Sequence, residues 1–246
     1  MTGPGGRSDD THPADGRVTG PGPAYGRFAP DSPNRRILPL YKSASLQVRA
    51  HVAVRWASCP FPAVAAQLPA VGRVLDVGCG HGLLSLYLAL GSPDRVVTGI
   101  DVDEDKLGAA RAAAAGAGLA ATFGVAAGGE LPPGPWAGIA IVDVLYLLAA
   151  DDQRTLLRTC AEALAPGGVL AVKEMALEPR WKARWNSLQE TAAVKILGIT
   201  EGEELTFLAP VDMATAMAAG GLSVRDRPVH RGYPHPHHLL VGRKSG

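Results

Sequence analysis

The segment at residues 74–82, VLDVGCGHG, constrains the fold of this chain more than any other feature of the sequence. Its first residues favour a buried strand, its glycines favour a tight turn, and the following LLSLYLAL has the pattern of an apolar helix. A parallel strand that ends in such a turn and restarts as a helix brings backbone N–H groups to the carboxyl edge of a sheet. We therefore expect an α/β fold with a small polar ligand bound over this turn.

The spacing and charge of the turn distinguish two classes of cofactor. A dinucleotide fingerprint reads Gly-x-Gly-x-x-Gly, whereas here the glycines are Gly78, Gly80 and Gly82, followed by Leu83. Asp76 precedes the turn, and its carboxylate would repel a pyrophosphate but attract the ammonium and sulfonium groups of S-adenosylmethionine (SAM). The acid therefore favours SAM over a nicotinamide dinucleotide.

With these residues the sequence resembles the class I SAM-dependent methyltransferases. The second motif of that family follows as VVTGID, and the resemblance implies that its last residue, Asp101, receives the two ribose hydroxyls of the cofactor. The predicted cofactor-binding residues are Asp76, Gly78, Cys79, Gly80, Gly82, Asp101, Val102, Ala126 and Asp143. The alternative for residues 78–82 is a tight turn that binds nothing.

The rest of the chain alternates strand and helix patterns, which is typical of a parallel sheet covered on both faces. We predict strands at 73–78, 96–101, 121–126, 138–144, 168–174, 222–228 and 237–243. We predict helices at 41–56 and 59–68, which precede the first strand, and at 82–90, 103–116, 151–165, 180–198 and 210–219. The predicted fold is a Rossmann-like, doubly wound, seven-stranded α/β sheet, mostly parallel with an antiparallel last strand.

Two strand ends depart from the family pattern. After the third strand the family often has an Asp that accepts the adenine amino group, but this sequence continues with Ala126 and further small residues. At the fourth strand Asp143 fits an acid that faces the methionine part of the cofactor, or alternatively caps the next loop. Tyr146 and Leu147 replace the second acid and the His of the metal-associated VLEH pattern, so we predict no metal.

The fifth predicted strand supplies candidates for catalysis. Lys173 and Glu174 end this strand beside the expected acceptor, and the alternative is that they form an exposed ion pair. An acceptor hydroxyl would need a base, whereas an acidic carbon or a carboxylate needs none. The predicted catalytic residues are Glu174, Tyr146 and His235.

Two further segments have both a functional and a structural interpretation. Trp181 and Trp185 lie one helical turn apart among basic residues, a pattern that fits a cover over an anionic or lipid-like acceptor, a membrane-surface contact or simply core packing. His235, His237 and His238 resemble a metal cluster, but the neighbouring prolines and LLVG favour a loop before an edge strand.

Composition predicts one enzyme domain behind a tail. The 246 residues are 47% hydrophobic, and the net charge of +1 argues against a nucleic-acid partner. We expect residues 1–36, rich in Gly and Pro, to be a disordered leader, and residues 37–246 to form the methyltransferase domain with an N-terminal helical cover. No membrane span, export signal or cysteine framework is evident, so we expect a cytoplasmic protein that makes at most peripheral membrane contact.

The sequence therefore predicts a SAM-dependent methyltransferase. The segments CPF, PRW, RGYP and VGRK resemble a bacterial subgroup that acts on small molecules, lipids or polyketide-like compounds, which implies a small or lipid-like acceptor, methylated on oxygen before carbon or nitrogen. The alternatives are a nicotinamide-dependent oxidoreductase and a SAM-binding module without catalytic activity. The sequence does not indicate the oligomeric state.

Overall fold

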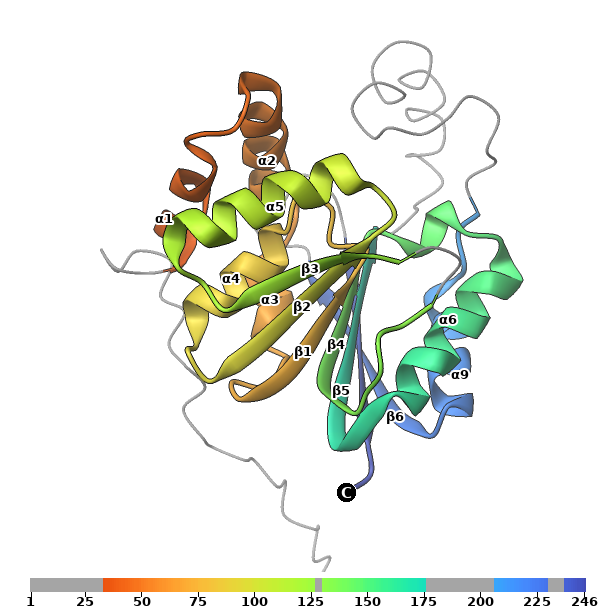
Figure 1. The fold of residues 1–246 in the computed structure, drawn as a ribbon. Coiled ribbons are helices and arrows are strands. Elements are labelled where there is room, and N and C mark those ends of the chain that lie inside the picture. Colours follow the sequence, from red (N-terminus) through yellow and green to blue (C-terminus); the bar gives the residue numbers. More distant parts are fainter. Residues whose placement is uncertain (1–32, 127–129, 176–205, 230–236) are drawn as a thin grey trace, which may run out of the picture.

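The computed structural model describes residues 33–126, 130–175, 206–229 and 237–246, and Figure 1 shows their arrangement. Seven strands form a single sheet in the order β3-β2-β1-β4-β5-β7-β6. All neighbouring strands are parallel except β7, which runs antiparallel to both β5 and β6. The predicted α/β fold, with its mostly parallel sheet and antiparallel last strand, is confirmed.

The strands lie close to their predicted positions. They are β1 (Gly72–Val77), β2 (Arg95–Asp101), β3 (Ala121–Val125), β4 (Trp136–Val142), β5 (Leu164–Met175), β6 (Leu222–Val229) and β7 (His237–Lys244). The predictions agree with the structure because the central strands are largely buried and consist mainly of apolar residues.

The helices cover both faces of the sheet, as Figure 1 shows. Before β1 lie α1 (Pro33–Arg36), the 3₁₀ turn η1 (Leu38–Tyr41), α2 (Leu46–Ser58) and α3 (Phe61–Ala65). The remaining described helices are α4 (Leu83–Gly91), α5 (Glu104–Ala117), the 3₁₀ turn η2 (Leu145–Leu147), α6 (Ala150–Glu162) and α9 (Pro210–Ala219). The helix predicted at 180–198 lies outside the described residues.

One apolar cluster packs against each face of the sheet. The first joins α2, α3 and α4 to side chains such as Val74 and Val97, and the second joins α6 and α9 to side chains such as Leu75 and Ile139. Because successive residues of a strand point to opposite faces, neighbours such as Val74 and Leu75 belong to different clusters. Because both faces of the sheet are packed, the sheet is rigid, and polar groups at the carboxyl ends of its strands are held in defined positions.

The N-terminal segment differs in detail from its prediction. A single helix was expected over 41–56, but η1 ends at Tyr41 and α2 begins at Leu46, after Ser45 accepts a hydrogen bond from the Val48 N–H. Residues 33–36, placed in the predicted leader, form the short helix α1. Residues 1–32 lie outside the described part, so the predicted division at residue 36 stays a prediction. In that described part, no helix is long and apolar enough to cross a membrane.

Candidate functional site

The glycine-rich turn, residues 78–82, connects β1 to α4 as predicted. Gly78, Gly80 and Gly82 all have positive φ, which allows the chain to reverse within a few residues. A Cβ on Gly82 would come within 2.9 Å of both Ala110 and Phe123, so this glycine lets α4 approach α5 and β3 closely. A Cβ on Gly80 would meet nothing nearer than Lys106 Cδ at 4.0 Å, so the chain leaves open space beside this residue.

Asp101 lies directly beside that open space. Its Oδ2 accepts the Gly80 N–H at 2.7 Å, and its Oδ1 accepts the Asp103 N–H at 2.9 Å. Each oxygen of a carboxylate can accept two hydrogen bonds, so both retain capacity for a second donor. Asp101 is half-buried, and the two backbone donors fix its orientation. The acid that ends β2 therefore contacts the glycine-rich turn.

Asp76 occupies a different environment from the one predicted. Its side chain is 2% exposed and accepts a hydrogen bond from the Ser85 hydroxyl of α4 at 2.6 Å. Burial raises the pKa of Asp76 to about 7, despite the opposing effect of Ser85. The carboxylate thus supports the start of α4, and this geometry does not favour the predicted direct attraction of a cofactor ammonium.

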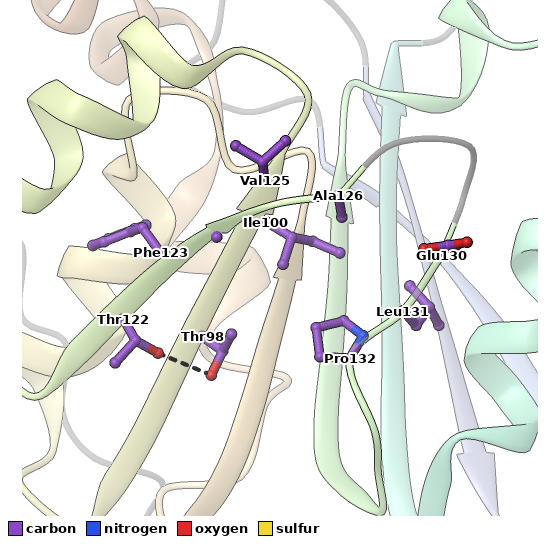
Figure 2. Close-up of a pocket in the computed structure, with 10 residues that line it drawn as sticks. Thr98, Ile100, Thr122, Phe123, Val125, Ala126, Glu130, Leu131 and Pro132 are labelled. Atoms are coloured by element: carbon purple, nitrogen blue, oxygen red, sulfur yellow. Dashed lines mark hydrogen bonds between the residues drawn. The ribbon is translucent and has the colours of Figure 1, made fainter.

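A cavity of about 400 Å³ lies on the face of β2 and β3 opposite α5, and Figure 2 shows its walls. Ile100, Ala126 and Leu131 provide apolar lining, and Glu130 brings a carboxylate to the same cavity. Val102, beside Asp101, is 72% exposed. In the described parts of the β3–β4 connection no helix covers this face. The family pattern indicates a missing Asp near Ala126, whereas no sequence pattern indicates that Glu130 lines the same cavity.

The N-terminal cover contacts the glycine-rich turn directly. The buried Tyr41 of η1 donates its hydroxyl to the His81 carbonyl at 2.6 Å. The ring of His51, on α2, lies 4.8 Å from the ring of His81. Burial lowers the pKa of His81 to about 4 and also lowers that of His51, so both rings are neutral at pH 7. The sequence predicted a helical cover but not these contacts.

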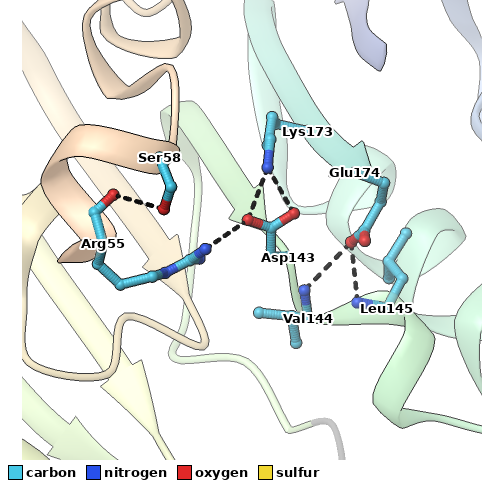
Figure 3. Close-up of polar contacts among 7 residues, drawn as sticks. All are labelled: Arg55, Ser58, Asp143, Val144, Leu145, Lys173 and Glu174. Atoms are coloured by element: carbon cyan, nitrogen blue, oxygen red, sulfur yellow. Dashed lines mark hydrogen bonds and ion pairs between the residues drawn. The ribbon is translucent and has the colours of Figure 1, made fainter. Parts of the chain in front are cut away.

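The carboxyl ends of β4 and β5 hold a buried ionic cluster, shown in Figure 3. The Lys173 ammonium lies 2.6 Å from both carboxylate oxygens of Asp143, and Arg55 Nη1 lies 2.8 Å from Oδ2. Burial opposes ionisation of Asp143, but Lys173 and Arg55 outweigh it and lower the pKa of the carboxyl. The alternative of an exposed Lys173–Glu174 pair is wrong, because both residues are buried and Lys173 pairs with Asp143.

Glu174 and Tyr146, two predicted catalytic residues, are enclosed. Glu174 Oε1 accepts the N–H groups of Val144 and Leu145 at 3.1 and 3.0 Å, and burial, reinforced by Asp143, raises its pKa to about 8. Tyr146 is 6% exposed, its ring stacks on Phe207 at 5.4 Å, and burial raises its pKa above the ordinary value. Neither side chain is an open base in this conformation.

Other predicted groups are only partly described. His235 and the helix with Trp181 and Trp185 lie outside the described residues. Of the three clustered histidines, His237 is buried in β7, whereas His238 is half-buried and lies 3.0 Å from Asp226. Across the described ranges, no three His, Cys, Asp or Glu side chains converge as metal ligands. The absence of a metal stays a prediction for the whole chain.

Sequence comparison identifies the central part of the chain. Residues 74–168 match the family model of a methyltransferase domain. The chain is 38% identical over 104 residues to the ubiquinone biosynthesis O-methyltransferase of Caulobacter sp. strain K31, covering 41% of this chain and 39% of the relative. It is 31% identical over 157 residues to the enzyme of that name from Marinobacter nauticus, covering 63% and 65%. The chain thus spans less than two thirds of the length of both relatives.

Solved structures of the same fold superpose on more of the chain than residues 74–168, which match the family model. An O-methyltransferase family protein from Burkholderia thailandensis superposes with a TM-score of 0.63 at 19% identity, over 85% of this chain and 62% of that one. The magnesium protoporphyrin IX methyltransferase of Synechocystis PCC 6803, solved with bound S-adenosylhomocysteine (SAH), gives a TM-score of 0.61 at 19% identity, over 86% and 93%. At these identities the likeness shows the fold alone.

Proposed function

We propose that this chain, whose domain at residues 74–168 places it in the class I SAM-dependent methyltransferase family, binds SAM over the glycine-rich turn and methylates a small-molecule acceptor. The observation that carries the proposal is the Asp101 carboxylate beside the open side of Gly80. The relatives' names support oxygen as the methylated atom.

The residues around the turn fit a nucleoside with a free ribose. The Asp101 oxygens, each already held by one backbone N–H, can accept the two vicinal hydroxyls through their remaining lone pairs. Gly80 leaves room for the ligand to pass close to the backbone. A nicotinamide dinucleotide fits less well, because the turn lacks the third-glycine spacing of the dinucleotide fingerprint.

We assign the adenine end of the ligand to the neighbourhood of Val102 and Ala126. Val102 offers an exposed apolar surface at the end of β2, and Ala126 leaves space beside it. Glu130 lines the same cavity as Ala126, so its carboxylate can take the role of the missing Asp and accept the adenine amino group. Gly78 and Cys79 stay predicted cofactor contacts, and Asp143 stays a predicted neighbour of the methionine part of SAM.

The chemistry requires little of the protein, because SAM supplies a methyl group already activated by its sulfonium. The chain's part is to hold the cofactor and the acceptor in line and to exclude water. Glu174 and Tyr146 are buried, and Glu174 Oε1 already accepts two backbone N–H groups, which disfavours both residues as bases in this conformation, while His235 stays a candidate. An acceptor that is acidic enough to ionise would need no base.

We further propose that residues 37–246 act as one methyltransferase domain, with η1 and α2 as its cover, on a small-molecule or lipid-like acceptor. The contacts of Tyr41 and His51 with the glycine-rich turn, and of Arg55 with Asp143 after β4, support the role of the cover. The names of the relatives support a hydroxylated acceptor.

Thermal shift with SAM, SAH, NAD⁺ and NADP⁺ tests the cofactor assignment. We expect stabilisation by SAM and SAH alone, since a ligand that binds only the folded state raises the melting temperature. Stabilisation by a dinucleotide alone would reverse the assignment. A second assay measures transfer of label from methyl-labelled SAM to a panel of phenols, hydroxy-lipids and polyketide-like compounds. An enzyme should form a labelled product, whereas a SAM-binding module without catalytic activity should bind SAH but form no labelled product.

A further inference from the structure

Glu174 binds the backbone of the turn that follows β4. The side chain is 5% exposed, and its Oε1 accepts N–H groups from Val144 and Leu145, as Figure 3 shows. Oε2 is also buried and has no partner among the residues that the structure describes. A buried carboxyl with two backbone donors on one oxygen fixes the course of the chain around those donors.

This turn is held in an unfavourable conformation. Asp143, which starts it, has φ of 55°, although a non-glycine residue in that region costs on the order of 1 kcal/mol or more. Two successive residues of β5 oppose this strain. Lys173 holds the Asp143 carboxylate, and Glu174 holds the next two backbone N–H groups.

The turn after β4 also forms a wall of the glycine-rich turn. A Cβ on Gly78 would lie only 2.3 Å from Val144 Cγ2, so the two residues are in close contact. Val144 is the residue whose N–H donates to Glu174. A continuous path of contacts therefore runs from Glu174, through Val144, to Gly78.

We propose that Glu174 is a positioning residue of the cofactor site, which sets the Val144 wall against the glycine-rich turn and does not act on the methyl acceptor. This inference rests on the proposed function for the identity of the ligand, but the contacts themselves do not depend on it. A carboxyl that is mostly protonated at neutral pH still accepts both N–H groups through Oε1. Glu174→Gln should therefore preserve the turn, because an amide oxygen also accepts two hydrogen bonds.

Hydrogen exchange by mass spectrometry tests the structural part without any ligand. Glu174→Ala should speed amide exchange at least tenfold in peptides covering residues 142–148 and also in those covering residues 76–84, whereas Glu174→Gln should resemble the wild type. Glu162→Gln, an exposed change on α6, is the matched control and should alter neither segment. Unchanged exchange at residues 76–84 in Glu174→Ala would overturn the proposal.

Calorimetric titration with SAH then tests the functional part. We expect Glu174→Ala to weaken SAH binding at least tenfold and Glu174→Gln to stay within about threefold of the wild type. Equal SAH affinity in the wild type and Glu174→Ala would overturn the positioning role. Absence of SAH binding in the wild type would instead contradict the proposed function, and the exchange data would still decide the contacts of Glu174.

Discussion

The carboxyl edge of the sheet carries two polar turns that are stabilised in different ways. At the first, after β1, backbone N–H groups and glycines surround one half-buried carboxylate, and open space lies beside Gly80. At the second, after β4, Asp143 is enclosed by two cations, and Glu174 is buried behind it. The first turn retains free hydrogen-bonding capacity for a ligand, whereas the second uses most of its capacity internally.

This difference suggests separate tasks for the two turns. A ligand site needs groups that are fixed in place yet still able to form bonds, and Asp101 meets both conditions. The second turn has a buried ion pair and a strained residue, which are features that maintain a shape. Substitutions at the second turn should therefore affect folding, and should reach the ligand only indirectly, through the contact of Val144 with Gly78. Substitutions on the open side of the first turn should affect binding directly.

The largest expected effect is at Lys173. Lys173→Met leaves the buried Asp143 carboxylate with Arg55 as its remaining cation, and breaking a buried pair from one side typically costs about 3–5 kcal/mol. The free energy of unfolding, from urea denaturation, should fall by that amount. Arg154→Ala, which breaks an exposed pair with Asp151 on α6, is the control and should change stability little. A loss below 1 kcal/mol in Lys173→Met would show that the cluster does not stabilise the fold.

The glycine-rich turn offers a contrast within one segment. Gly82→Ala forces a Cβ against Ala110 and Phe123 and adds left-handed strain, so unfolding should become easier by about 2–4 kcal/mol. Gly80→Ala adds the strain alone, about 1–2 kcal/mol, but places a methyl group in the open space. We expect only Gly80→Ala to fold well while losing SAH affinity, as measured by denaturation and titration. Equal losses of stability in Gly82→Ala and Gly80→Ala would contradict the different packing of these two glycines.

The raised pKa of Asp76 predicts that the stability of the protein depends on pH. Burial raises the pKa of Asp76 in the folded state to about 7, whereas its pKa in the unfolded chain is near 4. The folded state therefore binds this proton more tightly, and the resulting stabilisation is complete below about pH 4 and is lost as the pH rises through 7. Asp76→Asn removes the titration but keeps an acceptor for Ser85. The stability of the variant relative to the wild type should therefore increase from pH 4 to pH 8, by up to about 1.4 kcal/mol per pH unit. A constant difference across this range would contradict the raised pKa.

Arg55 should show the smallest effect of the set. Arg55→Gln removes the second cation of Asp143, but the two contacts with Lys173 remain, so we expect a loss of about 1 kcal/mol in urea denaturation. The variant should also loosen α2 from the strand edge, which faster amide exchange in residues 46–58 would reveal. A loss as large as that of Lys173→Met would mean that both cations are equally required.

The sequence predicted most of the fold because periodicity reports burial. The central strand β4 is a continuous apolar run, β1 is apolar apart from Arg73 and Asp76, and a turn with glycines marks the end of β1. The boundaries around η1 were missed because Ser45, a short-range capping residue, restarts the helix within an otherwise uniform pattern.

The candidate site was less predictable because it depends on long-range pairings. The family resemblance predicts Asp101 and the glycines as cofactor contacts, but no local pattern indicates that Arg55 reaches Asp143 or that Lys173 pairs with Asp143 instead of Glu174. The positions of Glu130 and Tyr41 likewise follow from how loops and covering helices pack. Pairings between residues that are distant in sequence become visible only once the sheet register is known.

Calorimetric titration of SAH into the wild type and Asp101→Ala tests the central claim most directly. Loss of hydrogen bonds to a charged acceptor costs about 1.5–3 kcal/mol, so the dissociation constant should rise about tenfold to 150-fold. Asp105→Ala, an exposed acid on α5, is the control and should bind SAH like the wild type. Wild-type affinity in Asp101→Ala, in a protein that remains folded, would contradict the assignment of this carboxylate to the ribose.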